Sequence, residues 1–267
     1  PINALLAVLG SYGGPTPTHA LLPGNPAINA GNNTGAPATD QRGIARPQQT
    51  TVDIGAFESR GFTLVVNSGN NQSTAAGSAF ALPLSLTVTS ANSEPVNGGR
   101  VTFTPPGSGA TATIAGNPAT ITSGSATSGT VTANTTIGGP YNVSADANGA
   151  TSINFSLTNT NSAPSFTPVA AISRQQGSPA GTAINVGTVS DAQTAAGSLT
   201  VTQIAGGTAT GITVTGITNT NGTIMAVVTA SCTATSGTVR FQVSDGTLTG
   251  TGDLTVNVTA NTAPTLV

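Results

Sequence analysis

Short runs in which apolar residues alternate with threonine and serine occupy most of this chain after residue 60. In one run Phe62, Leu64 and Val66 take every second position, and a second run from Leu82 to Val88 repeats the pattern. Successive side chains of a β-strand point to opposite faces, so a period of two predicts half-buried strands. Glycine, asparagine and serine clusters separate the runs at short spacing, which is typical of a β-sandwich. The sequence therefore predicts an all-β protein.

The composition narrows the possible functions. Charged residues make up 5% of the 267 residues and aromatic residues 3%, with no Trp, so the cores must be built from Val, Ile, Leu and Ala. The six basic residues are all Arg and do not cluster into a basic patch, which argues against nucleic-acid binding. The absence of Lys excludes Lys–Asn isopeptide crosslinks. No apolar run approaches the ~18 residues of a membrane-spanning helix, so we expect no span in this segment.

Two internal repeats predict tandem domains. NSAP at Asn161–Pro164 recurs as NTAP at Asn261–Pro264, 100 residues later, and QSTAAGSAF from Gln72 matches QGSPAGTAI from Gln176 at an offset of 104. A period near 100 residues corresponds to one small β-sandwich. We therefore expect a head over residues 1–60, a first immunoglobulin-like sandwich over 61–159, and a second over 160–260. Residues 261–267 are then the start of a further repeat or an exchanged strand.

The second sandwich offers a clear set of strands and the single cysteine. One cysteine excludes an intrachain disulfide. The period of two places Cys232 on the same face as Ile224 and Val228, so we expect a buried core thiol, with an intermolecular disulfide as the alternative. The predicted strands are Ala183–Val189, Leu199–Ile204, Gly211–Ile217, Ile224–Cys232, Thr238–Val243 and Leu254–Val258.

Charged side chains gather in the last third of the head. Arg forks can hold carboxylates and backbone carbonyls together, and an irregular segment leaves many backbone groups that need such partners. We therefore predict a structural charge network. The alternative, a catalytic pair such as Asp53 and Glu58, has no neighbouring His, Lys, Tyr or Cys to complete a site, so we expect no enzyme. Of the 6 basic and 8 acidic residues in the chain, the network takes Asp40, Arg42, Arg46, Asp53, Glu58 and Arg60.

The head resembles a known bacterial segment. LGSYGGPTPTHALLPGNPAINAGN, TDQRGIARPQ and VDIGAFE, within about residues 5–58, are similar to the closing segment of large secreted bacterial right-handed parallel β-helix proteins. The resemblance implies a cap that packs over the open end of a β-helix. It also leaves open an accessory role beside a secreted polysaccharide-degrading β-helix enzyme. His19 has no second metal ligand nearby, so we expect it to be structural.

The sandwiches resemble bacterial surface repeats. GGRVTFTPPGSGATATI, with GPYNVSADANG and FSLTN, is similar to immunoglobulin-like domains of bacterial adhesins, and FQVSDGTLTGTGDLTVNV resembles cadherin-like and immunoglobulin-like tandem repeats. The cadherin resemblance implies calcium at a domain junction, but acids are sparse and a turn role for Asp245-Gly246 is the alternative. No other cofactor is expected. The candidate calcium ligands are Asp191, Asp245, Asp253 and Asn261.

These observations favour a non-enzymatic bacterial structural protein outside the cell or on its surface. We expect the chain to be a mature fragment that forms a stalk or self-assembling fibre. An adhesin arm that binds carbohydrate or a cell surface is the alternative. The partner is another copy, through head-to-tail or strand-exchange contact, or another domain of a longer parent chain. The apolar ends supply the candidate contacts, which are Pro1, Ile2, Leu5, Leu6, Val8, Leu9, Pro264, Leu266 and Val267.

Overall fold

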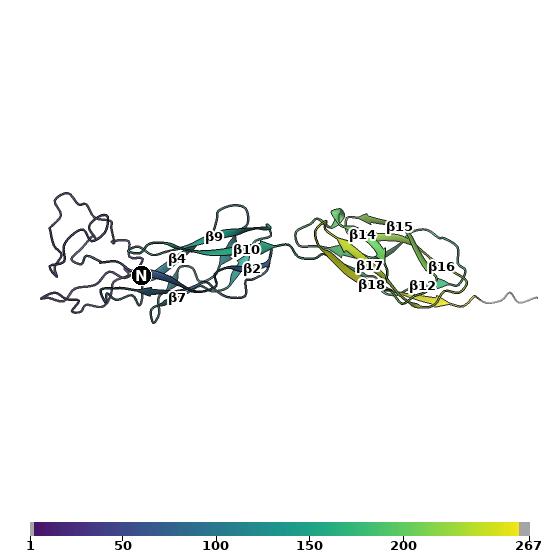
Figure 1. Ribbon diagram of the computed structural model, residues 1–267, viewed down its shortest axis with the longest axis horizontal. Helices are drawn as coiled ribbons and strands as arrows, with labels where there is room; N and C mark the ends of the chain where they lie inside the picture. The colour runs from purple at the N-terminus through teal and green to yellow at the C-terminus, as the bar shows by residue number, and fades with distance from the viewer. Residues whose placement is uncertain (1–2, 262–267) are drawn as a thin grey trace, which may run out of the picture. The chain divides into compact units, whose positions relative to one another are not determined.

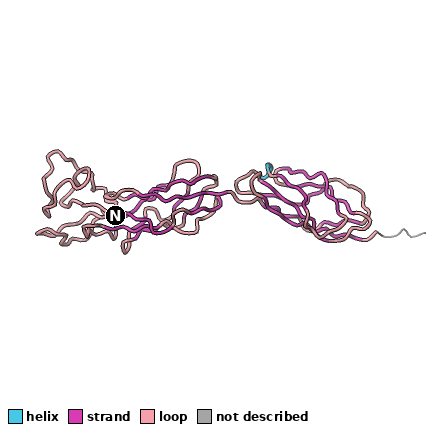
Figure 2. Tube along the Cα trace, in the orientation of Figure 1, coloured by secondary structure: helices cyan, strands magenta, loops and turns pink. Residues whose placement is uncertain are grey.

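The computed structural model describes residues 3–261, in two compact units. The first ends at Thr160 and the second begins at Asn161. Strands and loops make up almost all of the described chain, and its helical content there is the 3-10 turn η1 (Ala196–Ser198) (Figures 1 and 2). The prediction of an all-β protein is confirmed. None of the helical structure in residues 3–261 has the length and apolarity needed to cross a membrane.

The second unit is a sandwich of two four-stranded sheets. All six strands expected there are present, with ends shifted by a few residues, whereas the short strands β11 and β12 were not predicted because four residues are too few to show a period. One sheet has the order β11 (Ser165–Pro168), β13 (Ile184–Ser190), β16 (Thr223–Ala230) and β15 (Ile212–Thr220). The other has the order β12 (Ile172–Gln175), β18 (Thr249–Thr259), β17 (Gly237–Ser244) and β14 (Thr200–Ile204).

Strand β16 shows how far the alternation extends. Its residues alternate between half-buried and buried along the whole strand, with Ile224, Val228 and Ala230 facing the core. The strand ends at Ala230, and Cys232 follows it in a turn, where its side chain is exposed. The predicted buried thiol is therefore wrong. A face assignment made by counting in twos holds only as long as the backbone stays extended.

The first unit pairs a three-stranded sheet with a five-stranded sheet. Its alternating runs all form strands, while the strands of two to four residues were not predicted. The smaller sheet has the order β1 (Thr63–Ser68), β3 (Ser85–Thr89) and β7 (Ser125–Thr127). The larger has the order β2 (Gln72–Ala75), β10 (Ile153–Thr160), β9 (Gly138–Asp146), β4 (Arg100–Thr104) and β6 (Ala119–Thr120), and β5 (Ala112–Ile114) pairs with β8 (Val131–Ala133).

The first two strands are arranged in the same way in both units. The first strand lies in one sheet, and the second crosses to the other sheet and runs parallel to the last long strand, as β2 does with β10 and β12 with β18. A glycine with positive φ follows at Gly77 and again at Gly177. The equivalent glycines are therefore 100 residues apart (77 and 177), as are the NSAP and NTAP motifs. The match at an offset of 104 pairs residues that are not structurally equivalent, so that part of the repeat assignment is wrong.

The head, residues 3–60, has no regular sheet. Its ladder contacts are isolated bridges, including Leu6 with Leu21 and Gly10 with Thr18. Its apolar side chains nevertheless share one core with the first sandwich, which also contains Phe62 and Leu64. The head is thus part of the first compact unit and not a body of its own. Its contributions to that core are Leu5, Ala7, Ala20, Leu21, Leu22, Ile28 and Phe57.

Candidate functional site

Asp40 and Arg42 form the centre of a buried charge network in the head. The Arg42 guanidinium donates through Nε to Asp40 Oδ2 at 2.9 Å and through Nη2 to the Glu58 carbonyl at 2.5 Å. It also lies 3.4 Å from the centroid of the Phe57 ring. Asp40 accepts backbone N–H bonds from Arg42, Ile44 and Glu58. The Asp40–Arg42 ion pair therefore links the backbone of residues 42–44 to the backbone of Glu58.

A second part of the network surrounds Glu58 and Asp53. Glu58 accepts the Gln48 N–H at 3.0 Å and the Asp53 N–H at 2.9 Å, and the Arg46 Nε lies 3.3 Å from it. Asp53 accepts the N–H groups of Asn29 at 2.7 Å and Ser59 at 2.6 Å. Both carboxylates are buried, at 1% and 3% exposed. Their oxygens hold backbone donors and both residues are closed to solvent, so they lack the access that a catalytic pair needs.

Glu94 belongs to the network and was not predicted. It lies in the loop after β3, 6% exposed, and its carboxylate is 3.2 Å from Arg60 Nε and 3.6 Å from Arg42 Nη1. It also accepts bonds from the Ser59 hydroxyl and the Arg60 N–H. Glu94 therefore connects the head to the sandwich. Its only signal in the sequence is that no other acid lies between Arg60 and Asp146.

The pKa values of the two aspartates shift in opposite directions from the ordinary value. Burial tends to raise the pKa of Asp40, but hydrogen bonds from the Glu58 N–H, the Arg42 side chain and the Ile44 N–H outweigh it, and the pKa is lowered. Burial raises the pKa of Asp53, and the nearby charge of Glu58 adds to this against the bonds from Asn29 and Ser59. No guanidinium forms a hydrogen bond with Asp53, so burial prevails there and the pKa stays raised.

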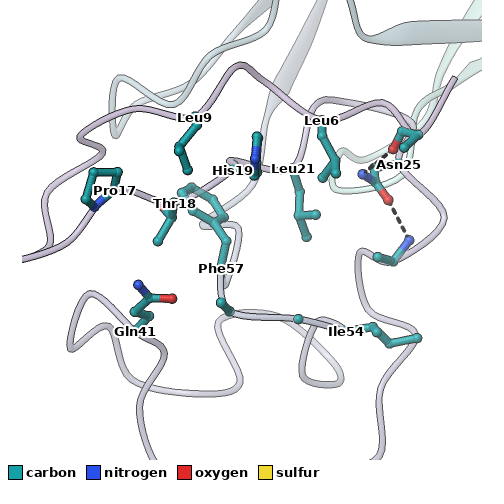
Figure 3. A pocket seen from close by; sticks show the side chains of 14 residues that line it. Leu6, Leu9, Pro17, Thr18, His19, Leu21, Asn25, Gln41, Ile54 and Phe57 are labelled. Atoms are coloured by element: carbon teal, nitrogen blue, oxygen red, sulfur yellow. Dashed lines mark hydrogen bonds between the residues drawn. The ribbon is translucent and has the colours of Figure 1, made fainter.

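An apolar pocket of about 480 Å³ opens on the head beside this network. Figure 3 shows Leu6, Leu9 and Leu21 on one side and Ile54 on the other, and the Phe57 side chain extends from the Ile54 side toward Leu9. Leu6, Leu9 and Ile54 are large apolar side chains that remain 44%, 62% and 57% exposed. Phe57, which carries Arg42 on its ring, is 2% exposed. The charge network therefore holds the floor of the pocket in place.

Polar groups in the pocket are few and uncharged. The Thr18 hydroxyl is buried and has no hydrogen-bond partner in the described structure. His19 contacts the Ala7 carbonyl through Nδ1 at 2.8 Å, so this nitrogen carries the proton. Asn25 donates to the Ala4 and Leu5 carbonyls. No Asp, Glu, Lys or Arg lines the pocket, which suits an uncharged apolar occupant.

The predicted subunit contacts differ in accessibility. Leu5 is 7% exposed and packs in the chain's own core, whereas Val8 is 81% exposed beside the exposed Leu6 and Leu9. Leu6 lies between residues that bond to the neighbouring segment, since Ala7 N–H donates to Ala20 and Leu22 N–H donates to Leu5. The N–H groups of Leu6 and Val8 have no backbone acceptor in the described chain. Pro1, Ile2, Pro264, Leu266 and Val267 lie outside the described residues.

The four candidate calcium ligands do not form one cluster. Asp253 makes a two-fold ion pair with Arg240, at 2.7 Å for each bond. Asp245 accepts from the Asn161 amide at 2.7 Å and from the Thr247 and Leu248 N–H groups, which lower its pKa. Within residues 3–261 no three His, Cys, Asp or Glu side chains come close enough to hold a metal ion. Calcium binding stays a prediction.

Asp191 and Asn261 take separate positions in the same unit. Asp191 accepts the Gln193 and Thr194 N–H groups of its own turn, and its second oxygen is buried without a partner in the described structure. Asn261 accepts from the Gln175 amide instead. The turn role proposed for Asp245-Gly246 agrees with the positive φ of Gly246. Sequence order placed these acids near strand ends but did not show which ends adjoin.

The similarity of this chain to known proteins is weak. No protein-family model matches, and no curated protein matches. Solved structures with a similar arrangement include domains 4–9 of the surface layer protein SbsC, at 20% identity over 73% of this chain and 31% of that one, with a TM-score of 0.28. Titin domains Z1Z2 in complex with telethonin match at 13% identity over 74% and 98%, with a TM-score of 0.30. The chain spans about a third of the first of these structures.

Proposed function

We propose that this chain is an extracellular structural protein of a bacterial surface, built from tandem immunoglobulin-like sandwiches and without enzymatic activity. The observation that carries the proposal is the exposed apolar pocket, which is supported on a buried charge network. The network's acids hold backbone N–H groups and its arginines hold acids and carbonyls, so it serves as a scaffold. Its four carboxylates, those of Asp40, Asp53, Glu58 and Glu94, are buried.

The pocket suits the end of another β-structured layer. The edge at Leu6 and Val8 offers N–H groups that have no backbone acceptor within residues 3–261, beside an apolar surface, and an added strand satisfies both at once. The similarity of residues 5–58 to segments that close β-helices supports a sealing role. The occupant we propose is a second copy of this chain, because the uncharged pocket and a formal net charge of −2 present little repulsion between copies. Contacts that repeat without closing produce a fibre.

Sedimentation and electron microscopy of the purified chain test this. We expect particles longer than one molecule, and we expect Leu9→Arg to return them to single chains because it places a charge in the apolar mouth. Val65→Arg is the matched control, since Val65 is 55% exposed on a strand away from the pocket. A chain that stays single at all concentrations, or assembly that survives Leu9→Arg, contradicts the proposal of self-assembly.

A further inference from the structure

Arg100 is the arginine whose side chain has no partner in the described structure. The other five arginines each contact an acid or a carbonyl: Arg42, Arg46, Arg60 and Arg240 form ion pairs, and Arg174 donates to the Val228 carbonyl at 2.7 Å. The Arg100 N–H is bonded to the Pro23 carbonyl, and Arg100 is the register partner of Thr120. Its side chain is exposed. In a chain with so few charges, this leaves one guanidinium available to a ligand.

Arg100 lines a hollow of about 290 Å³ where the head meets the first sandwich. Asp146 lines the same hollow from the neighbouring strand, where it is the register partner of Thr102. The Ser144 and Ser152 hydroxyls donate to Asp146, which holds the carboxylate in place. Arg100 and Asp146 form no ion pair with each other, so neither charge neutralises the other. A guanidinium and a carboxylate among the residues that line one hollow suit a ligand that carries an anion and hydroxyl groups together.

A second hollow of about 390 Å³ lies beside the first. The two share Asp146, Ala147 and Asn148, and the second adds Asn29 and Ser152 to the polar lining. Two polar hollows with shared lining residues offer places for consecutive units of a chain-like ligand. No Phe or Tyr lines either hollow, so hydrogen bonds and the ion pair must supply the binding without ring stacking. Such binding is salt-sensitive.

The walls of these hollows are rigid. The Gly24 N–H donates to the Asn148 carbonyl at 3.1 Å, and the Asn148 amide donates back to the Asn25 carbonyl at 3.1 Å. Gly24 has a φ of +81°, and a Cβ there would come within 2.6 Å of the Arg100 carbonyl oxygen. Only glycine lets the head approach β4 this closely. A site formed in advance in this way spends little free energy on ordering when a ligand binds.

We propose that these two hollows together form a groove that binds an acidic glycan. Arg100 binds the carboxylate of a uronate residue, and Asp146 and Asn148 bind the hydroxyl groups of the same or the next sugar. An acidic peptide such as polyglutamate offers Asp146 further carboxylates, which it repels, and none of the hydroxyl groups that a uronate sugar presents to it. This inference concerns a different surface from the apolar pocket. The groove can therefore bind glycan whether or not the chain forms fibres.

Native electrophoresis in gels that contain polygalacturonate tests the proposal. We expect the chain to be retarded relative to a gel containing dextran, and we expect added salt to remove the retardation. Arg100→Ala should weaken it by roughly tenfold, the effect of losing one charge-assisted pair. Arg240→Ala is the matched control, because it removes the same charge from the exposed surface of the other unit. An unchanged thermal unfolding midpoint establishes that Arg100→Ala still folds, and Arg100→Gln repeats the test with a longer side chain.

Three results overturn the proposal. The first is equal mobility of the native chain in both gels. The second is equal loss of retardation in Arg100→Ala and Arg240→Ala, which reduces the effect to overall charge. The third is equal retardation by polyglutamate, which assigns the groove to anions in general and not to glycans. Asp146→Asn sharpens the result, since it should weaken polygalacturonate binding and leave any polyglutamate binding unchanged or stronger.

Discussion

The head and the second sandwich satisfy the hydrogen-bonding groups of their backbones by different chemistry. In the second unit, continuous ladders pair the backbone, and the alternating side chains of β16 and β17 need only be apolar on one face. In the head, backbone N–H groups of irregular segments bond to the buried carboxylates of Asp40, Asp53 and Glu58. The comparison shows that a segment without a ladder can still be well ordered when buried charges take over the pairing.

Arg42→Ala is expected to have the largest effect. It leaves the Asp40 and Glu94 carboxylates buried without their shared cation, and breaking a buried pair in this way costs about 3–5 kcal/mol of unfolding free energy. Only the first unit should lose stability. Both tyrosines, Tyr12 and Tyr141, lie in that unit, so tyrosine fluorescence in a denaturant titration reports it separately. A loss below about 1 kcal/mol shows that the network does not stabilise the head.

Glu94→Gln tests the connection between head and sandwich. Glutamine keeps the shape and one acceptor but removes the charge that faces Arg42 and Arg60, so we expect a loss of about 1.5–3 kcal/mol from the first unit. The same fluorescence titration measures it. Combining it with Arg42→Ala should give less than the sum of the two losses, because both variants remove the same ion pair. Simple additivity indicates that the two residues act independently.

Acid should destabilise the first unit through Asp40. The pKa of Asp40 is lower in the folded state than its ordinary value of 3.8, so its contribution is complete above that value and is lost as the pH falls through the folded pKa. Asp53 has a raised pKa and acts in the opposite sense, since its ionisation costs stability as the pH rises above 3.8. The denaturant midpoint of unfolding, followed by tyrosine fluorescence, should therefore fall steeply as the pH is lowered into the acid range. Asp40→Asn should make this decrease with pH shallower. An unchanged decrease assigns the acid sensitivity to another group.

Ile224→Val tests the second unit. Ile224 is fully buried in the alternating strand β16, and the loss of one methylene there is expected to cost about 0.5–1.5 kcal/mol. The tyrosine signal should not change, because it reports the other unit. Differential scanning calorimetry follows both units and should show one shifted transition. A shift in the tyrosine signal as well indicates that the two units unfold together.

Arg240→Ala is expected to have the smallest effect. Its bidentate pair with Asp253 has good geometry, but both side chains are substantially exposed, and water and salt screen the interaction. Calorimetry should show no measurable change in the transition of the second unit. Set beside Arg42→Ala, this variant separates the contribution of burial from that of ion pairing. An effect of equal size in both variants removes the distinction drawn between the two regions.

The sequence by itself determined the all-β class, the six longer strands of the second sandwich and the segment in which charges gather. These follow from local properties, since the direction of each side chain along an extended backbone depends only on its neighbours in the chain. Strand ends are not local in this sense. Extending the period-two alternation past the end of the strand therefore predicted a buried Cys232. The strand stops at Ala230, and the thiol lies exposed in a turn.

Only the tertiary structure decided which distant groups meet. Glu94 joins the network from another loop, Leu5 enters the core while Leu6 stays exposed, and Gly177 rather than the Gln176 match marks the repeat. The head shares its core with the first sandwich, and the polar groove beside Arg100 forms where the two meet. The apolar pocket forms within the head, between residues from Ala4 to Phe57. Each of these depends on contacts between residues far apart in the chain, and no short-range pattern encodes them.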